Sequence, residues 1–183
     1  MRYIHNLISA SRLVATPACA ILAWFEATQP AALAVAIIVA LTDFVDGPLA
    51  RRSGGASPFG ALLDMTSDKV FLCTMLIVLA AIGKAPVWAA AIITARELLV
   101  LAFRTIAASR NRPLPIATFG KLKTFMLYFL VPLALANPDW WRAVWFLALA
   151  ATVSACVSLV EYTVKMRADL ADEFFGRGSA ARK

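Results

Sequence analysis

Long apolar runs make up most of the chain, and short groups of proline, glycine and charged residues separate them. Most runs hold about the 20 residues that an α-helix needs to cross a bilayer, and proline and glycine mark the turns between helices. We therefore expect six transmembrane helices. The breaks fall at residues 29–30, 53–55, 83–86, 110–115 and 137–138. The predicted helices cover residues 12–25, 31–52, 58–82, 87–108, 120–136 and 140–166.

The two ends of the chain follow a different pattern. Residues 1–11 are amphipathic and predict a short N-terminal helix at the membrane interface, whereas residues 167–183 are polar and predict a cytoplasmic tail. No stretch remains for a separate soluble domain. The expected architecture is an all-α integral membrane protein, with six transmembrane helices plus a short N-terminal amphipathic helix in a single domain of residues 1–183.

Composition supports the membrane assignment. The chain is 61% hydrophobic and 16% charged, with a mean hydropathy of +0.75. Soluble domains average about 45–50% apolar and about 25% charged residues. A soluble core of this chain length could not bury such a surplus of apolar side chains.

The net charge of +7 raises the question of nucleic-acid binding, but the basic residues lie in loops beside apolar runs and form no basic arm. We expect no nucleic-acid partner. The positive-inside rule accounts for the charge better: with both termini cytoplasmic, only Lys84 and Arg142 remain outside. Trp140 and Trp141, next to the outer Pro138, are typical of interfacial anchors. We therefore expect a multi-pass protein of a bacterial-type inner membrane, with a cytoplasmic active site.

Four aspartates lie inside the second and third apolar runs, where ionisable groups are costly and usually functional. Asp43 and Asp46 are three residues apart, and Asp64 and Asp68 are four apart, so each pair shares one face of its helix. In an antiparallel hairpin that turns near residues 54–56, the two pairs come level. We therefore predict a box of four carboxylates.

Carboxylates this close repel one another in a low dielectric unless cations neutralise them. Oxygen ligands without nearby histidine or cysteine favour Mg²⁺, Mn²⁺ or Ca²⁺, and two ions could share the box. Mg²⁺ also suits a diphosphate ligand, because it takes its remaining ligands from phosphate and water. A divalent cation transporter is a distant alternative, which does not explain the glycines and the arginine between the aspartates.

The pattern resembles the CDP-alcohol phosphotransferase family, whose signature DxxDGxxAR, eight residues, then GxxxDxxxD matches at every fixed position. The resemblance implies six transmembrane helices, a homodimer, and displacement of CMP from a CDP-linked donor by an alcohol. It also implies Asp43, Asp46 and Asp64 as ligands of one or two Mg²⁺ (or Mn²⁺) ions, and Asp68 as a metal-site residue that deprotonates the acceptor. Asp46, Gly47, Ala50, Arg51 and Gly60 would bind the nucleotide.

Further segments, residues 6–12, 94–98 and 120–124, are similar to the phosphatidylglycerophosphate synthase branch of that family. The donor would be CDP-diacylglycerol, entering from the membrane lipids, and the acceptor sn-glycerol 3-phosphate. The alternatives are a cardiolipin synthase and a phosphatidylinositol phosphate synthase.

A phosphorylated acceptor also fits the basic residues in and beside the later apolar runs. Arg96 lies inside such a run and should pair with a carboxylate or an anionic ligand. Glu97 is its sequence neighbour but points about 100° away on the helix. The candidate acceptor-binding residues are Arg96, Arg104, Lys121 and Lys123.

Overall fold

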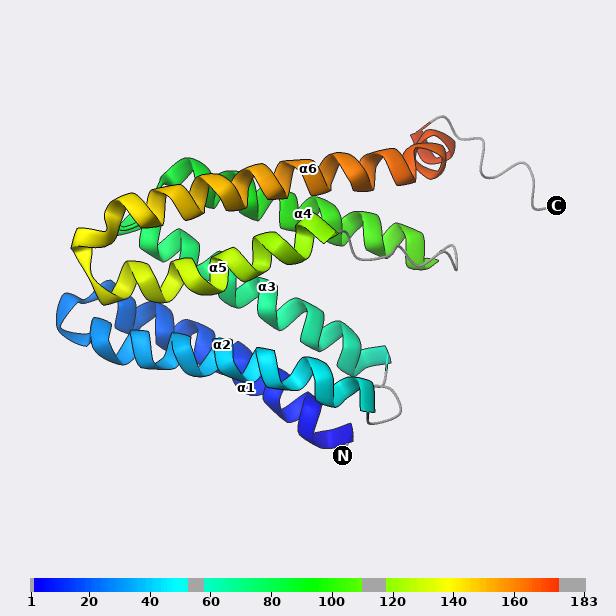
Figure 1. The fold of residues 1–183 in the computed structure, drawn as a ribbon. Coiled ribbons are helices and arrows are strands. Elements are labelled where there is room, and N and C mark those ends of the chain that lie inside the picture. The colour runs from blue at the N-terminus through cyan, green and yellow to red at the C-terminus, as the bar shows by residue number, and fades with distance from the viewer. Residues whose placement is uncertain (1, 53–57, 110–117, 175–183) are drawn as a thin grey trace.

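The computed structural model describes residues 2–52, 58–109 and 118–174, and within them the side chains of residues 10–42, 66–107, 118–164 and 167. The described chain is entirely helical. The helices run alternately up and down, so that the first helix begins and the last helix ends at the same end of the bundle (Figure 1). The α-helices are α1 (Arg2–Trp24), α2 (Gln29–Arg52), α3 (Pro58–Ala81), α4 (Val87–Ser109), α5 (Thr118–Ala136) and α6 (Trp141–Phe174). Two short 3₁₀ turns, Glu26–Thr28 and Pro138–Trp140, precede α2 and α6.

The helix limits agree with the apolar runs, with differences at the two ends of the chain. The predicted N-terminal segment is not a separate helix, because α1 continues without a break from Arg2 to Trp24. No proline or glycine occurs before Pro17 to interrupt it. α6 extends to Phe174, so the first part of the predicted tail is helical. Hydropathy marks where a helix leaves apolar surroundings, and the helix itself can continue into water.

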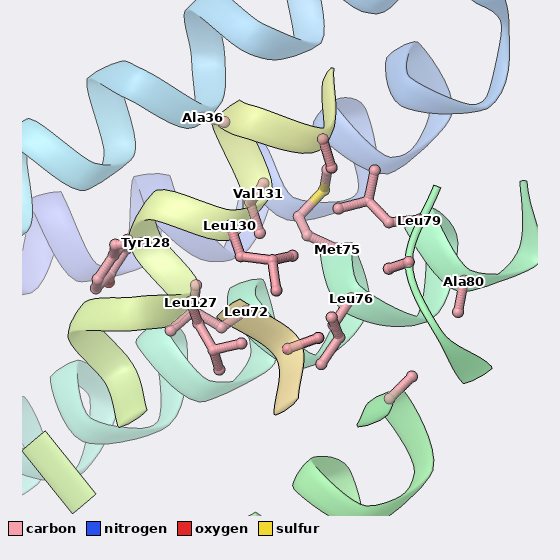
Figure 2. Packing of buried hydrophobic residues seen from close by; sticks show 14 of the residues in the cluster. Ala36, Leu72, Met75, Leu76, Leu79, Ala80, Leu127, Tyr128, Leu130 and Val131 are labelled. Carbon is pink, nitrogen blue, oxygen red and sulfur yellow. The ribbon is translucent and has the colours of Figure 1, made fainter. Parts of the chain in front are cut away.

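α3 and α5 lie at the centre of the described bundle, since α3 packs against α1, α4 and α5, and α5 packs against α2, α3 and α6. The α3 side chains Leu72, Met75, Leu76 and Leu79 are at most 3% exposed and meet α5 at the centre of the core (Figure 2). Small residues of α6 bring that helix close to its neighbours, as is usual between membrane helices. These are Ala148, Ala151 and Ala155, all fully buried.

The described outer surface of the bundle carries many large apolar side chains. Many large side chains that point outward are half or more exposed, where a helix of a soluble bundle would carry polar residues. Among the described residues, two helical segments are long and apolar enough to cross a membrane, Thr118–Ala136 and Pro138–Val164. α4 carries the charges of Arg96, Glu97 and Arg104 in its interior. The strongly exposed apolar side chains include Val14, Ile21, Leu41, Leu98, Phe146 and Val160.

The turn between α3 and α4 is fixed by backbone and side-chain hydrogen bonds. Gly83 has φ +76°, and the N–H groups of Gly83 and Lys84 donate to the carbonyls of Ala80 (3.2 Å) and Leu79 (2.8 Å). This is a Schellman cap, which needs a left-handed residue where glycine carries no penalty. The Lys84 ammonium group then donates to Gln29 Oε1 at 2.6 Å, which ties this turn to the start of α2.

All five tryptophans of the chain lie at the end of the bundle opposite the termini. Trp24 ends α1, and Trp88 lies in the first turn of α4. Trp140 ends the 3₁₀ turn before α6, and Trp141 and Trp145 lie at the start of α6. The rings of Trp88 and Trp145 are 6.2 Å apart in an edge-to-face contact, and the Arg142 guanidinium lies 5.3 Å from the centre of the Trp141 ring. Tryptophans gather in this way at membrane–water interfaces.

Candidate active site

The predicted carboxylates lie on the two helices where the sequence placed them. Asp43 and Asp46 are in α2, and Asp64 and Asp68 are in α3. Of these four side chains, only that of Asp68 is among those described. The other three, and the candidate nucleotide-binding residues Gly47, Ala50, Arg51 and Gly60, lie outside the described side chains. Their roles therefore stay predictions.

Asp68 forms an ion pair with Arg12 of α1. The Arg12 side chain is only 2% exposed and that of Asp68 is 23% exposed. The two helices pack closely along their length (Figure 1). Arg12 ends the segment 6–12 that is similar to the phosphatidylglycerophosphate synthase branch, and the structure brings it to the site. A buried guanidinium needs a counter-charge, and here the last aspartate of the motif supplies it.

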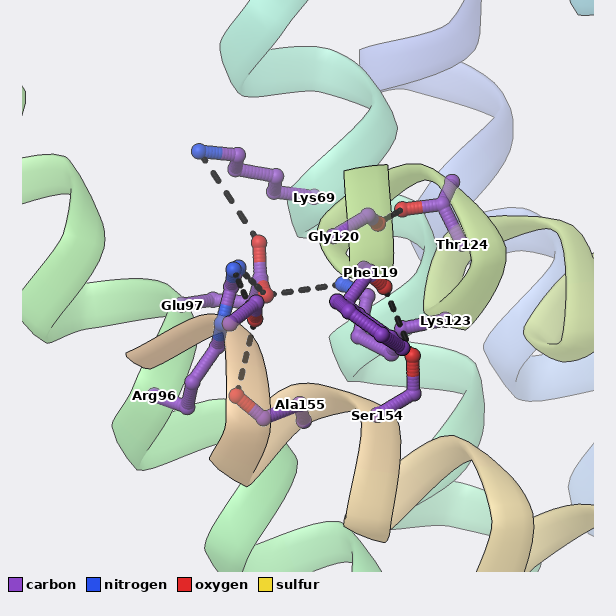
Figure 3. A network of polar contacts seen from close by, with 10 residues as sticks. Lys69, Arg96, Glu97, Phe119, Gly120, Lys123, Thr124, Ser154 and Ala155 are labelled. Atoms are coloured by element: carbon purple, nitrogen blue, oxygen red, sulfur yellow. Dashed lines mark hydrogen bonds and ion pairs between the residues drawn. The ribbon is translucent and has the colours of Figure 1, made fainter. Parts of the chain in front are cut away.

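A second charged cluster surrounds Glu97 of α4, whose side chain is 6% exposed (Figure 3). Glu97 Oε1 accepts from Arg96 Nη1 at 2.5 Å and from Lys123 Nζ of α5 at 2.7 Å. Lys69 of α3 has its ammonium group 3.8 Å from Glu97 Oε2. Arg96 Nη2 also donates to Ser158 Oγ of α6 at 2.6 Å. One carboxylate thus links α3, α4, α5 and, through Arg96, α6.

The contact between Arg96 and Glu97 corrects the expectation from the helical wheel. An angle of about 100° separates the Cα–Cβ directions, but the long arginine side chain bridges that angle. The prediction that Arg96 pairs with a carboxylate is confirmed. Its guanidinium also lies 5.8 Å from the centre of the Tyr162 ring, and that of Arg104 lies 6.0 Å from the same centre.

A small cavity of about 120 Å³ joins the two charged clusters. Its polar lining comes from three helices, and Leu72, Cys73 and Leu127 supply the apolar part. Because the last aspartate of the motif lines the same cavity as the Glu97 cluster, a molecule bound there would contact both. The polar lining residues are Asp68, Lys69, Glu97, Lys123 and Thr124.

The four candidate acceptor-binding residues do not all reach this cavity. Lys123 lines it, and Arg96 supports it through Glu97. Arg104 lies beside Tyr162 instead, and Lys121 is exposed on α5. Lys69, which directly follows the last aspartate of the motif in the sequence, faces Glu97. The signal that could have identified this cluster is that Glu97 is the only acidic residue in the apolar run 87–108.

The chemistry of the donor set fits a hard divalent cation. Carboxylate oxygens are the ligands that Mg²⁺ and Mn²⁺ prefer, and α2 and α3 each carry two aspartates about one turn apart. Within the described side chains, Asp68 has Arg12 as its one ion-pair partner.

An all-helical bundle with an apolar outer surface and a charged interior defines a membrane protein with a buried polar site. Residues 2–172 match the CDP-alcohol phosphatidyltransferase family, and the chain belongs to that family. It is therefore a transferase.

Relatives with curated names cover nearly the whole chain. A probable phosphatidylglycerophosphate synthase of Mycobacterium tuberculosis is 32% identical over 91% of this chain and 83% of its own length. The CDP-diacylglycerol–glycerol-3-phosphate 3-phosphatidyltransferase of Escherichia coli is 31% identical over 93% of this chain and 98% of its own length. A cardiolipin synthase (CMP-forming) of Streptomyces coelicolor is 31% identical over 81% of this chain and 70% of its own length.

Proposed function

We propose that this chain transfers a phosphatidyl group from CDP-diacylglycerol to sn-glycerol 3-phosphate, which forms phosphatidylglycerophosphate and releases CMP. The observation that carries the proposal is the cavity beside Asp68, which Lys69 and Lys123 line. A phosphorylated acceptor needs buried cations of this kind, and an uncharged alcohol does not. The names of the relatives from Mycobacterium tuberculosis and Escherichia coli agree with this choice.

In this proposal Asp68 is the catalytic residue, and its carboxylate takes the proton from the acceptor hydroxyl. Asp43, Asp46, Asp64 and Asp68 would hold one or two Mg²⁺ or Mn²⁺ ions. Ions bound there would supply positive charge for the donor diphosphate and for the departing CMP. Asp46, Gly47, Ala50, Arg51 and Gly60 line the nucleotide site. No serine, cysteine or histidine nucleophile is required, so the transfer is a single displacement.

We further propose that all six helices cross the membrane, with both termini and the active site in the cytoplasm. The tryptophans at the far end of the bundle support this orientation, together with the small number of basic residues there. By resemblance to the family, the functional unit is a homodimer. Accessibility of single cysteines placed after residue 174 and next to Lys84, in sealed vesicles, tests the orientation.

An acceptor panel tests the reaction. Purified protein with CDP-diacylglycerol and Mg²⁺ is offered glycerol 3-phosphate, inositol phosphate, serine or phosphatidylglycerol, and CMP release is measured. We expect release with glycerol 3-phosphate above the other acceptors. The cardiolipin synthase relative makes phosphatidylglycerol the most informative competitor. Equal turnover with phosphatidylglycerol would overturn the proposed acceptor.

A further inference from the structure

Lys69 differs from the other basic residues around Glu97 in the contacts of its charged group. Its Nζ is covered by protein and makes no hydrogen bond within the described residues, since Glu97 Oε2 is 3.8 Å away. Lys123, in contrast, donates to Glu97 at 2.7 Å, and Arg96 donates to both Glu97 and Ser158. Burying an ammonium group without a hydrogen bond is costly. A ligand that accepts from Lys69 would remove that cost.

The charges around the cavity favour a negatively charged ligand. Among the side chains that the structure describes, Lys69, Arg96 and Lys123 carry three positive charges against the single negative charge of Glu97, an excess of two. Asp68 does not reduce this excess, because it pairs with Arg12. A phosphate monoester carries about −1.5 to −2 charges at pH 7. Such a group would balance the cluster.

The size of the cavity limits what can enter it. Its volume of about 120 Å³ is well below the roughly 300–1,000 Å³ of pockets that hold drug-sized ligands. A nucleotide or a lipid headgroup with its chains is too large, whereas a phosphate group on a short carbon chain is of suitable size. Asp68 lines the same cavity as Lys69 and Lys123. A phosphate held by these lysines would thus keep the rest of a small acceptor next to Asp68.

We propose that Lys69 is a specificity-determining residue that binds a phosphate oxygen of the acceptor, with Lys123 as the second ligand. Glu97 is a positioning residue, which holds Lys123 at the cavity while Lys69 stays available. Arg96 acts through Glu97, because its Nη1 donates to Glu97 and its Nη2 donates to Ser158. This assignment rests on the proposed function, since it concerns how that acceptor is distinguished from an uncharged alcohol.

The test uses the full-length protein, purified in detergent, with Lys69→Gln, Lys69→Arg and, as a matched control, Lys84→Gln. Lys84 is at the opposite end of the bundle, in the turn next to Gln29. Loss of one charge-assisted hydrogen bond should raise the KM for glycerol 3-phosphate by roughly ten- to a hundredfold in Lys69→Gln. The KM for CDP-diacylglycerol should change less than about twofold, because the substitution removes a contact to the acceptor and none to the donor. Lys69→Arg should keep the acceptor KM within severalfold.

A binding measurement separates ligand contact from a merely structural role. Inorganic phosphate and glycerol 3-phosphate should each raise the thermal unfolding temperature of the original protein and of Lys84→Gln, whereas glycerol should not. Lys69→Gln should lose this shift. If Lys69→Gln does not fold, Lys69→Met takes its place, since an apolar side chain of similar length is better tolerated in a buried position.

The outcomes are distinct for the two proposals. If Lys69→Gln keeps the original acceptor KM and the phosphate-induced shift while phosphatidylglycerophosphate still forms, the assignment of Lys69 is overturned and the proposed function stands. If the unsubstituted protein and Lys84→Gln release CMP with another acceptor and not with glycerol 3-phosphate, the proposed function itself is overturned.

Discussion

Glu97 should be the most important single charge for the stability of the described bundle. Its carboxylate accepts from Arg96 at 2.5 Å and from Lys123 at 2.7 Å, and these two side chains are 5% and 3% exposed. Glu97→Gln keeps the shape of the side chain and removes its charge. Two cations then lie buried without a counter-charge. Charge-assisted hydrogen bonds contribute about 1.5–3 kcal/mol each, so two give about 3–6 kcal/mol. Substitutions that remove one partner of a buried ion pair give a second estimate, a destabilisation of about 3–5 kcal/mol.

We expect Glu97→Gln to lower the free energy of unfolding by about 3–5 kcal/mol. The measurement is an SDS titration of the protein in mixed micelles, followed by far-UV circular dichroism. Glu26→Gln is the matched control, because Glu26 lies exposed in the turn before α2. It should change the free energy by less than about 0.5 kcal/mol.

A double-mutant cycle with Lys123→Met then tests whether the two residues act together. Residues in direct contact show interaction energies of about 0.5–3 kcal/mol, and this buried pair should lie in the upper half of that range. The double variant should therefore lose less free energy of unfolding than the sum of the losses of the two single variants. A Glu97→Gln loss below about 1 kcal/mol, or additive losses in the cycle, would refute the role of Glu97 as the shared counter-charge.

Further predictions concern the turn, the core and the catalytic carboxylate. Gly83→Ala should lower the free energy of unfolding by about 1 kcal/mol through the left-handed backbone alone, since no atom lies within 4 Å of an added Cβ. Gly83→Asn should cost less. Leu76→Ala should cost about 2–5 kcal/mol, because Leu76 is fully buried. Ile77→Ala, on the exposed side of the same helix, should cost clearly less. Asp68→Asn should abolish CMP release from CDP-diacylglycerol while the protein stays folded, and EDTA should abolish the release in a way that added Mg²⁺ restores.

Each of these expectations has a result that contradicts it. A Gly83→Ala protein as stable as the original would exclude the Schellman cap, and equal losses for Leu76→Ala and Ile77→Ala would exclude the described orientation of α3. CMP release by Asp68→Asn at the original rate would remove Asp68 from the chemistry. Full activity in EDTA would exclude a divalent ion.

The helices could be predicted from the sequence because proline and glycine interrupt long apolar runs. The prediction was wrong near residue 11, where a change from amphipathic to apolar character does not end α1. α6 likewise continues past residue 166 to Phe174, into the segment that was predicted only to be a polar tail. In both places, hydropathy reports the surroundings of the helix, whereas backbone hydrogen bonding decides its length.

The candidate site was predictable only where its residues share one helix. Asp68 followed from spacing along the chain, but its partner Arg12 belongs to α1, and no local pattern shows that α1 packs on α3. The cluster of Lys69, Glu97 and Lys123 joins three helices in the same way. Contacts between distant segments depend on how helices pack, which a single sequence does not reveal.

Because every tryptophan lies at one end of the bundle, the intrinsic fluorescence of the protein reports on one side of the membrane. Its indole emission arises near Trp24, Trp88 and the start of α6. In sealed vesicles, iodide added on that side should quench the emission, whereas iodide confined to the other compartment should have little effect. The orientation of the purified enzyme in a bilayer can thus be read without any attached dye.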